Sequence, residues 1–176
     1  VDGVSDNIFI TCKYHFPNLD NLKKCGFIED SSLQTLSLPQ LQESGDIHAS
    51  RAQTLNLPQL QETGFIDATL AQTLSLPQLQ ESGDIHARSA QILNLPKLQK
   101  SGDIDASRAQ TLNLPQLQES GHIYAKSAQK IIIRKNLINK IYEKKSDVQI
   151  IDPSEYIEEL NDSVIYNLMK SFLLKS

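Results

Sequence analysis

The sequence predicts a mainly β protein, in which a parallel β-solenoid of about six 19-residue coils is followed by a C-terminal α-helical cap. Two observations carry this prediction. The dipeptide Leu-Pro recurs every 19 residues, at 38–39, 57–58, 76–77, 95–96 and 114–115. Six of the seven glycines keep the same spacing, at Gly26, Gly45, Gly64, Gly83, Gly102 and Gly121. One repeat of this length cannot bury a core alone, so we expect the repeats to stack as coils.

Residues 1–18 are predicted to form an N-terminal capping strand. The stretch "NIFITCKYHF" alternates apolar side chains from Ile8 to Phe16, which is the period of a strand with one buried face. A solenoid that ended without a cap would expose the backbone edge of its first strands.

Residues 19–130 are predicted to form the solenoid, with two short strands in each copy. Ile47-x-Ala49 and Leu55-x-Leu57 both alternate with period 2, so one face of each strand is buried. Pro58 and Gly64 argue against a helix inside the copy. We expect the proline to follow the point at which ladder bonding ends. The repeated glycine is expected to take a positive φ at a corner.

Residues 131–176 are predicted to form a cap of two helices over the last coil. Ile133, Leu137 and Ile141 have helical spacing and suggest the first helix. The second helix is expected to begin with Asp152 as its N-cap and Pro153 at its first position. The alternative role for these helices is a homodimer or partner-helix surface.

The repeat, read from its isoleucine, is "IHASRAQTLNLPQLQESGD". It resembles the leucine-rich repeat, whose core L-x-L-x-x-N/C-x-x-L often continues into L-P-x-L, and the resemblance covers residues 19–130. It implies a right-handed parallel solenoid with the I-x-A strand on the partner-binding face. Two departures from the family's pattern predict a flatter, β-helix-like rod instead of a deep horseshoe. Ala52 and its equivalents stand where the family has Asn or Cys, and the copy is shorter than the family's usual length of about 20–29 residues.

Specificity is expected at the outward positions that differ between copies, in three columns beside the buried Ile and Ala. The candidate partner-binding residues are Asp46, His48, Phe65, Asp67, Asp84, His86, Arg88, Asp103, Asp105, His122 and Tyr124. The columns combine mixed charge with aromatic rings, and we expect exposed His–Asp pairs along His48, Asp67, His86 and Asp105.

No metal, cofactor or enzymatic activity is expected from these columns. Neighbouring side chains in the ladder would be about 5 Å apart, but a linear array fits tetrahedral metal ligation poorly. Catalysis needs groups that converge in a concavity, and the exposed columns of a rod do not supply one.

The composition excludes other classes of partner. The formal net charge is −4, and basic residues are spread along the chain, so nucleic-acid binding is not expected. No apolar run is long enough to span a membrane, and no signal peptide is visible, which favours a cytoplasmic or host-delivered protein over a secreted one. Cys12 and Cys25 could form a disulfide or remain buried thiols.

The leading functional hypothesis is therefore a non-catalytic protein-interaction module, of the kind found among bacterial effectors, surface proteins and phage-encoded inhibitors of host factors. The alternative is an ice- or crystal-surface-binding solenoid that uses rows of small polar side chains. These rows comprise Thr35 and Ser37, Thr54 and Asn56, Thr73 and Ser75, Ile92 and Asn94, and Thr111 and Asn113. Ordinary strand propensity also accounts for such residues.

Overall fold

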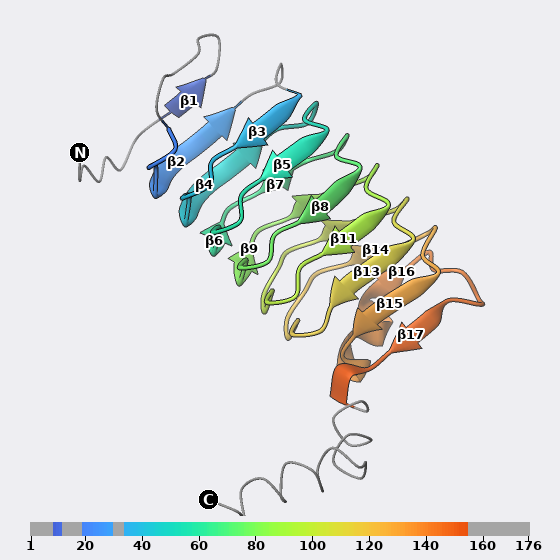
Figure 1. The fold of residues 1–176 in the computed structure, drawn as a ribbon. Helices are drawn as coiled ribbons and strands as arrows, with labels where there is room; N and C mark the ends of the chain where they lie inside the picture. The colour runs from blue at the N-terminus through green and yellow to red at the C-terminus, as the bar shows by residue number, and fades with distance from the viewer. Residues whose placement is uncertain (1–8, 12–18, 30–33, 155–176) are drawn as a thin grey trace, which may run out of the picture.

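The structure, a computed structural model, describes residues 9–11, 19–29 and 34–154, and over these ranges it is a parallel β-solenoid (Figure 1). The coils stack along one axis into a rod of about seven turns, one more than the repeat count predicts. Strands in successive coils pair in parallel, and from β2 to β14 the partners on face A lie 19 residues apart, as in Ile47 with Ile66 and Ile85 with Ile104. The predicted mainly β fold, a parallel β-solenoid, is thus confirmed.

Three rows of short strands run along the rod. Face A carries the isoleucine column, on β2 (Lys24–Glu29), β4 (Glu43–His48), β7 (Ile66–Asp67), β10 (Ile85–His86), β12 (Ile104–Asp105), β14 (Ile123–Tyr124) and β16 (Ile141–Tyr142). Face B consists of β3 (Thr35–Ser37), β5 (Thr54–Asn56), β8 (Thr73–Ser75), β11 (Ile92–Asn94), β13 (Thr111–Leu114), β15 (Lys130–Ile133) and β17 (Gln149–Ile151). Row C lies just before the glycine of each coil. It consists of the start of β2 and of β4, β6 (Glu62–Thr63), β9 (Glu81–Ser82), and single paired residues, Lys100 and Glu119, that continue the ladder as isolated β-bridges.

Two tight turns connect these rows in each coil. The Ala52 N–H donates to the Ala49 carbonyl at 2.9 Å, and the Leu60 N–H donates to the Leu57 carbonyl at 3.3 Å. Pro58 occupies the second position of the latter turn, where its fixed φ fits and no N–H is required. Because β5 ends at Asn56, the proline follows the end of the ladder, as expected.

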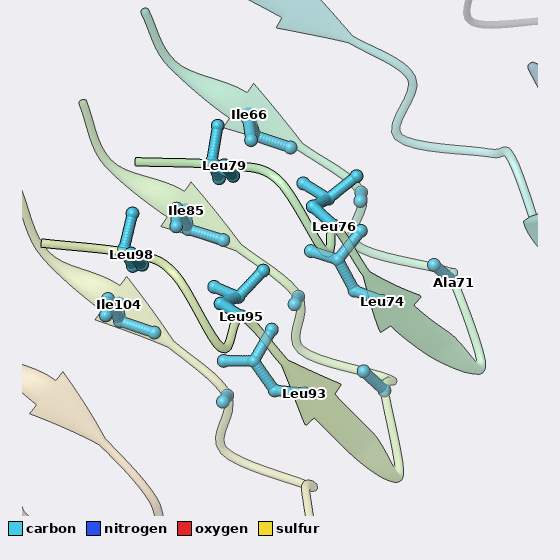
Figure 2. Close-up of a cluster of buried hydrophobic side chains, with 14 of the residues drawn as sticks. Ile66, Ala71, Leu74, Leu76, Leu79, Ile85, Leu93, Leu95, Leu98 and Ile104 are labelled. Carbon is cyan, nitrogen blue, oxygen red and sulfur yellow. The ribbon is translucent and has the colours of Figure 1, made fainter. Parts of the chain in front are cut away.

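The core is built from columns of identical or similar apolar side chains (Figure 2). Ile66, Ile85 and Ile104 are completely buried and form one column, while the leucines of face B and of the Leu-Pro turn form others. Each such side chain stabilises the fold by about 1.5–3 kcal/mol relative to exposure. Alanines flank the first turn of each coil and are also buried.

The repeated glycines do not take positive φ within the described residues, which corrects the expectation from the sequence. They are needed because another coil lies too close. A Cβ on Gly102 would lie 2.1 Å from Oδ1 of Asp84, an aspartate of the preceding coil. Gly64 and Gly121 face aspartates of their preceding coils in the same way. The glycine column therefore provides space rather than an unusual backbone conformation.

A strand precedes the first coil, as predicted. β1 (Phe9–Thr11) pairs in parallel with β2, so that Ile10 is the partner of Ile28 in the isoleucine column. The remainder of the predicted capping segment at 1–18 lies outside the described residues.

The first predicted C-terminal helix is wrong, because residues 130–151 form a further coil. In β15, Ile131 pairs with Leu112 and Ile133 with Leu114, so both continue leucine columns. A short 3-10 helix, η1 (Lys135–Lys140), then leads to β16 and the loop before β17. Leu137 and Ile141 are buried. The spacing that suggested a helix thus consists of inward positions around one coil.

At the predicted start of the second helix, the structure describes the cap residue and the first two positions, and the rest of the helix stays a prediction. Helical conformation starts at Pro153, and Oδ1 of Asp152 accepts hydrogen bonds from the Ser154 N–H at 2.9 Å and from its Oγ at 2.7 Å. Oδ2 of Asp152 accepts from the Lys135 N–H at 2.9 Å, which ties this cap to η1. Residues from 155 onward lie outside the described part of the chain. Within the described ranges, no helix is both long and apolar enough to cross a membrane.

Candidate binding face

Aromatic rings and imidazoles collect on face A. Every Phe, Tyr and His whose side chain the structure describes lies in one of its outward columns. These residues are Phe27, His48, Phe65, His86, His122, Tyr124 and Tyr142. Face B and row C carry chiefly Thr, Ser, Asn, Gln, Glu and Lys instead. Face A is thus chemically distinct from the rest of the rod.

The first group of rings forms a zigzag, the aromatic ladder, made of Phe27, His48, Phe65 and His86. Ring centroids lie 5.0 Å apart between Phe27 and His48, 5.2 Å between His48 and Phe65, and 4.8 Å between Phe65 and His86. These separations are typical of stabilising aromatic pairs. All four side chains are half-buried, so the ladder is both ordered and accessible.

The second group is the tyrosine cluster, made of His122, Tyr124 and Tyr142. The centroids of His122 and Tyr142 lie 4.6 Å apart in an edge-to-face arrangement, and those of the two tyrosines lie 6.1 Å apart. Tyr142 falls within the predicted helical cap at 131–176 and was not among the predicted partner-binding residues. The available signal was the dipeptide Ile141-Tyr142, which repeats Ile123-Tyr124 at a spacing of 18 instead of 19.

Three of the predicted partner-binding aspartates hold neighbouring coils together. Oδ1 of Asp46 accepts the Phe65 N–H at 2.8 Å, and Oδ1 of Asp84 accepts the Asp103 N–H at 2.8 Å. Oδ1 of Asp103 accepts the His122 N–H at 2.7 Å. These inter-coil carboxylates therefore have a structural role, and their charges remain on face A.

The other two predicted aspartates order their own turns. Oδ1 of Asp67 accepts from the Thr69 N–H at 3.1 Å and from its Oγ1 at 2.7 Å. Asp105 accepts in the same manner from the N–H and hydroxyl of Ser107. Such bonds from a side chain to the backbone two residues on are typical of Asx-turns.

Arg88 forms an ion pair with Asp105, in which Nε lies 2.6 Å from Oδ2. Partial burial acts to raise the pKa of Asp105, but hydrogen bonds from Arg88 and Ser107 outweigh it and lower the pKa. The pKa of Arg88 is raised by its hydrogen bond to Asp105 and by the charges of Asp105 and Asp67. Arg88 thus lies in a negative electrostatic environment.

The expected His–Asp ladder is not formed as a series of ion pairs. His48, Asp67, His86 and Asp105 are successive register partners, but the aspartates bond to their own turns and the imidazoles contact Phe rings. Within the described ranges, the His–carboxylate contact at ion-pair distance is that between Nδ1 of His122 and Oδ1 of Asp103, at 3.3 Å. The same part of the chain has no group of three or more His, Cys, Asp or Glu side chains placed to hold a metal ion.

Cys25 is buried at the start of the rod. Its Sγ lies 3.3 Å from Oγ of Ser44, and burial raises the pKa of its thiol, a shift that the hydrogen bond with Ser44 opposes. Cys12 lies outside the described residues.

Face B presents the rows of small polar residues that motivated the alternative hypothesis. Register pairing aligns Thr73, Ile92 and Thr111 in one row, and Thr35 with Thr54 at its other end. In the second row, Nδ2 of each described Asn donates to the Ser or Asn one coil earlier, at 2.7–3.0 Å. Ile92 interrupts the threonine row and is 47% exposed.

Comparisons with protein-family models, with curated proteins and with solved structures find no match to this chain. The fold is that of a β-solenoid, and the likeness to leucine-rich repeats is one of sequence pattern. The function is therefore inferred from the chemistry of face A and face B.

Proposed function

We propose that this protein is a non-catalytic interaction module that binds a protein partner through face A. The observation that carries the proposal is the concentration of every described aromatic and imidazole side chain on that face. Aromatic residues and arginine are enriched where protein interfaces gain most of their binding energy. The other described surfaces of the rod carry mostly Thr, Ser, Asn, Gln, Glu and Lys side chains, which contribute less to the core of interfaces.

Order in the free protein supports the same proposal. The aromatic ladder is held by mutual ring contacts, and the carboxylates beside it are fixed by hydrogen bonds to backbone N–H groups. Side chains that are already ordered lose less entropy on binding. The likeness to leucine-rich repeats also assigns partner binding to the I-x-A strand, which belongs to face A. Bacterial effectors, surface proteins and phage inhibitors of host factors remain the candidate classes.

The test is affinity capture with two matched variants. The face A variant combines Phe65→Thr, His86→Thr and Tyr124→Thr, because threonine retains strand propensity while removing each ring. The face B variant combines Thr54→Ser, Thr73→Ser and Ile92→Thr. A partner identified with the wild-type protein is expected to be retained by the face B variant and lost by the face A variant. Retention by both variants, or loss by both at unchanged thermal stability, would contradict the proposal.

A second candidate function rests on the register of face B. Threonines aligned in register on parallel strands provide regularly spaced methyl and hydroxyl groups, an arrangement suited to an ordered water or crystal surface. Thermal hysteresis is the measurement. Wild-type protein is expected to show it if this candidate holds, and the double variant Thr54→Tyr, Thr73→Tyr is expected to lose it. Absence of hysteresis in the wild type excludes this function and leaves the proposal for face A unaffected.

A further inference from the structure

Negative charge concentrates on face A, on the surface proposed above to bind a partner. Two cations, Arg88 and Lys126, lie in its outward columns, and Arg51 and Arg108 are exposed one residue further on in the same turns. The carboxylates in those columns are Glu29, Asp46, Asp67, Asp84, Asp103 and Asp105. This excess of acidic groups means that face A attracts positively charged partners.

The inter-coil carboxylates keep capacity for a further partner. Asp46, Asp84 and Asp103 each use Oδ1 for the bond to the next coil. An ionised carboxylate has two oxygens and about four acceptor sites, so Oδ2 can accept from a partner's side chain. The bond to the backbone also fixes the carboxylate in place before binding.

Arg88 demonstrates the type of contact that this face makes. Its guanidinium bonds to Oδ2 of Asp105 while the side chain remains 57% exposed. A guanidinium can therefore approach the carboxylates of face A from solvent without displacing the hydrogen bonds between Asp105 and Ser107.

The rings border the carboxylates on both sides along the rod. The aromatic ladder ends at His86, and the tyrosine cluster begins at His122, so Asp103 and Asp105 lie in the coil between them, while Asp84 lies in the coil of His86. A guanidinium or ammonium group gains energy over the face of an aromatic ring, and the gain adds to its attraction to a carboxylate. Rings and acids in this order suit a segment that carries several cations.

We propose that face A binds a cationic segment of its protein partner, rich in arginine or lysine, with the cations on the inter-coil carboxylates and the neighbouring rings. The proposal rests on the function proposed above and adds the chemical class of the partner. Glu62, Glu81 and Glu119 of row C are exposed in a row that has no aromatic residue among the described residues, so they provide a comparison.

The experiment measures binding of a fluorescent hexa-arginine peptide by anisotropy at low and at high salt. The face A charge variant combines Asp46→Asn, Asp84→Asn and Asp103→Asn, which removes three charges and keeps an Oδ1 acceptor for each backbone N–H. The matched control combines Glu62→Gln, Glu81→Gln and Glu119→Gln in row C. Thermal unfolding verifies that both variants are folded. We expect the face A charge variant to bind about tenfold more weakly and the row C control to change less than about twofold.

Three results would overturn the inference. They are equal weakening in both variants, absence of hexa-arginine binding at low salt, or preferential binding of hexaglutamate. These outcomes differ from failure of the proposed function. If the face A variant loses its captured partner while hexa-arginine does not bind, the interaction function stands and the cationic class of partner is wrong. If hexa-arginine binds but the face A variant captures the partner as well as the wild-type protein does, the interaction function itself fails.

Discussion

At the scale of single residues, one contact explains two of the repeated columns. An aspartate of one coil accepts a backbone N–H from the next, and its carboxylate fills the space where a side chain on the following glycine would lie. The aspartate supplies a hydrogen bond of the stronger, charge-assisted kind. The glycine supplies the room that this bond requires.

This contact predicts different costs for two glycine-to-alanine substitutions. Gly102→Ala places a Cβ 2.1 Å from the Asp84 carboxylate, whereas Gly83→Ala meets no atom closer than 3.2 Å because Phe65 replaces the aspartate in the preceding coil. We expect Gly102→Ala to cost about 1–3 kcal/mol of unfolding free energy and Gly83→Ala less than half as much. Urea denaturation measures both. Adding Asp84→Ala should relieve part of the Gly102→Ala penalty, and a strictly additive double variant would argue against the contact.

A pair of isoleucines tests the inward and outward positions of the coil. Ile85 is completely buried, whereas Ile92 is 47% exposed on face B. The same change to Asp therefore places a charge in the core at position 85 and in solvent at position 92. We expect Ile85→Asp to lose cooperative unfolding, because an unpaired charge in the core costs more than about 4 kcal/mol. Ile92→Asp should stay within about 0.5 kcal/mol of wild type. Far-UV circular dichroism with urea titration checks both, and a stable Ile85→Asp variant would contradict the burial of this column.

At the scale of elements, the coils that could be predicted from the sequence are those that carry both turn signals, the Leu-Pro dipeptide and the glycine. Leu-Pro and glycine mark the turns of the central copies, and period-2 alternation marks their strands. The last coil has neither the Leu-Pro dipeptide nor the glycine. Its Ile133 aligns with Leu114, but Arg134 and Lys135 stand in place of the Pro and Gln that follow Leu114. Its apolar residues also happen to fit helical spacing. Local pattern could not decide between the two, because the deciding factor was the register with β13.

The candidate face was predicted in its columns but not in its contacts. Alternation showed that residues such as His48 and Asp67 point outward. The neighbour that each side chain contacts depends on the distance between coils and on the geometry of the turns. Asp67 therefore bonds to Thr69, and His48 packs between Phe27 and Phe65. Positive φ was likewise the wrong reason for the glycines, since close approach is visible only in three dimensions.

The junction after β17 is expected to make stability depend on acid. Hydrogen bonds from the hydroxyl and N–H of Ser154, together with that from the Lys135 N–H, lower the pKa of Asp152. The unfolded chain then binds more protons than the folded protein between the two pKa values. This stabilisation is present above the unfolded value of about 3.9 and is lost as the pH falls through the lowered folded value.

Replacing Asp152 tests this linkage. The change Asp152→Asn should reduce the difference in unfolding free energy between pH 7 and pH 3, as measured by urea denaturation at each pH. Asp147→Asn, an exposed change in the loop before β17, serves as the control and should leave that difference unchanged. A pH profile identical in the Asp152→Asn variant and the wild type would contradict a stabilising role for this carboxylate.

At the scale of the whole molecule, the rod is a one-dimensional stack. Each coil contacts mainly the coil before and the coil after it, and every column passes through the same positions. Stability in such a protein is approximately the sum of terms for each coil and for each interface between coils. We therefore expect the insertion or deletion of a whole coil to be tolerated, because it keeps the columns in register.

This leads to a prediction about deletions. Removing residues 83–101 takes out one complete coil and joins Ser82 to Gly102, which preserves every column. Removing Leu93 alone shifts the inward and outward positions of β11 relative to both neighbours. We expect the 19-residue deletion to remain folded with a modest loss of stability, and the single deletion to be the more damaging. Thermal unfolding of both proteins provides the comparison, and the reverse order would contradict a register-limited stack.

The contact between Asp84 and Gly102 also bears on how such repeats diverge over evolutionary time. The aspartate can be exchanged first, because Phe65 already occupies the same position ahead of Gly83. While an aspartate faces it, a glycine that gains a side chain displaces the carboxylate and its hydrogen bond. At Gly64, Gly102 and Gly121, mutational drift is therefore easier when the aspartate of one coil changes before the glycine of the coil that follows it.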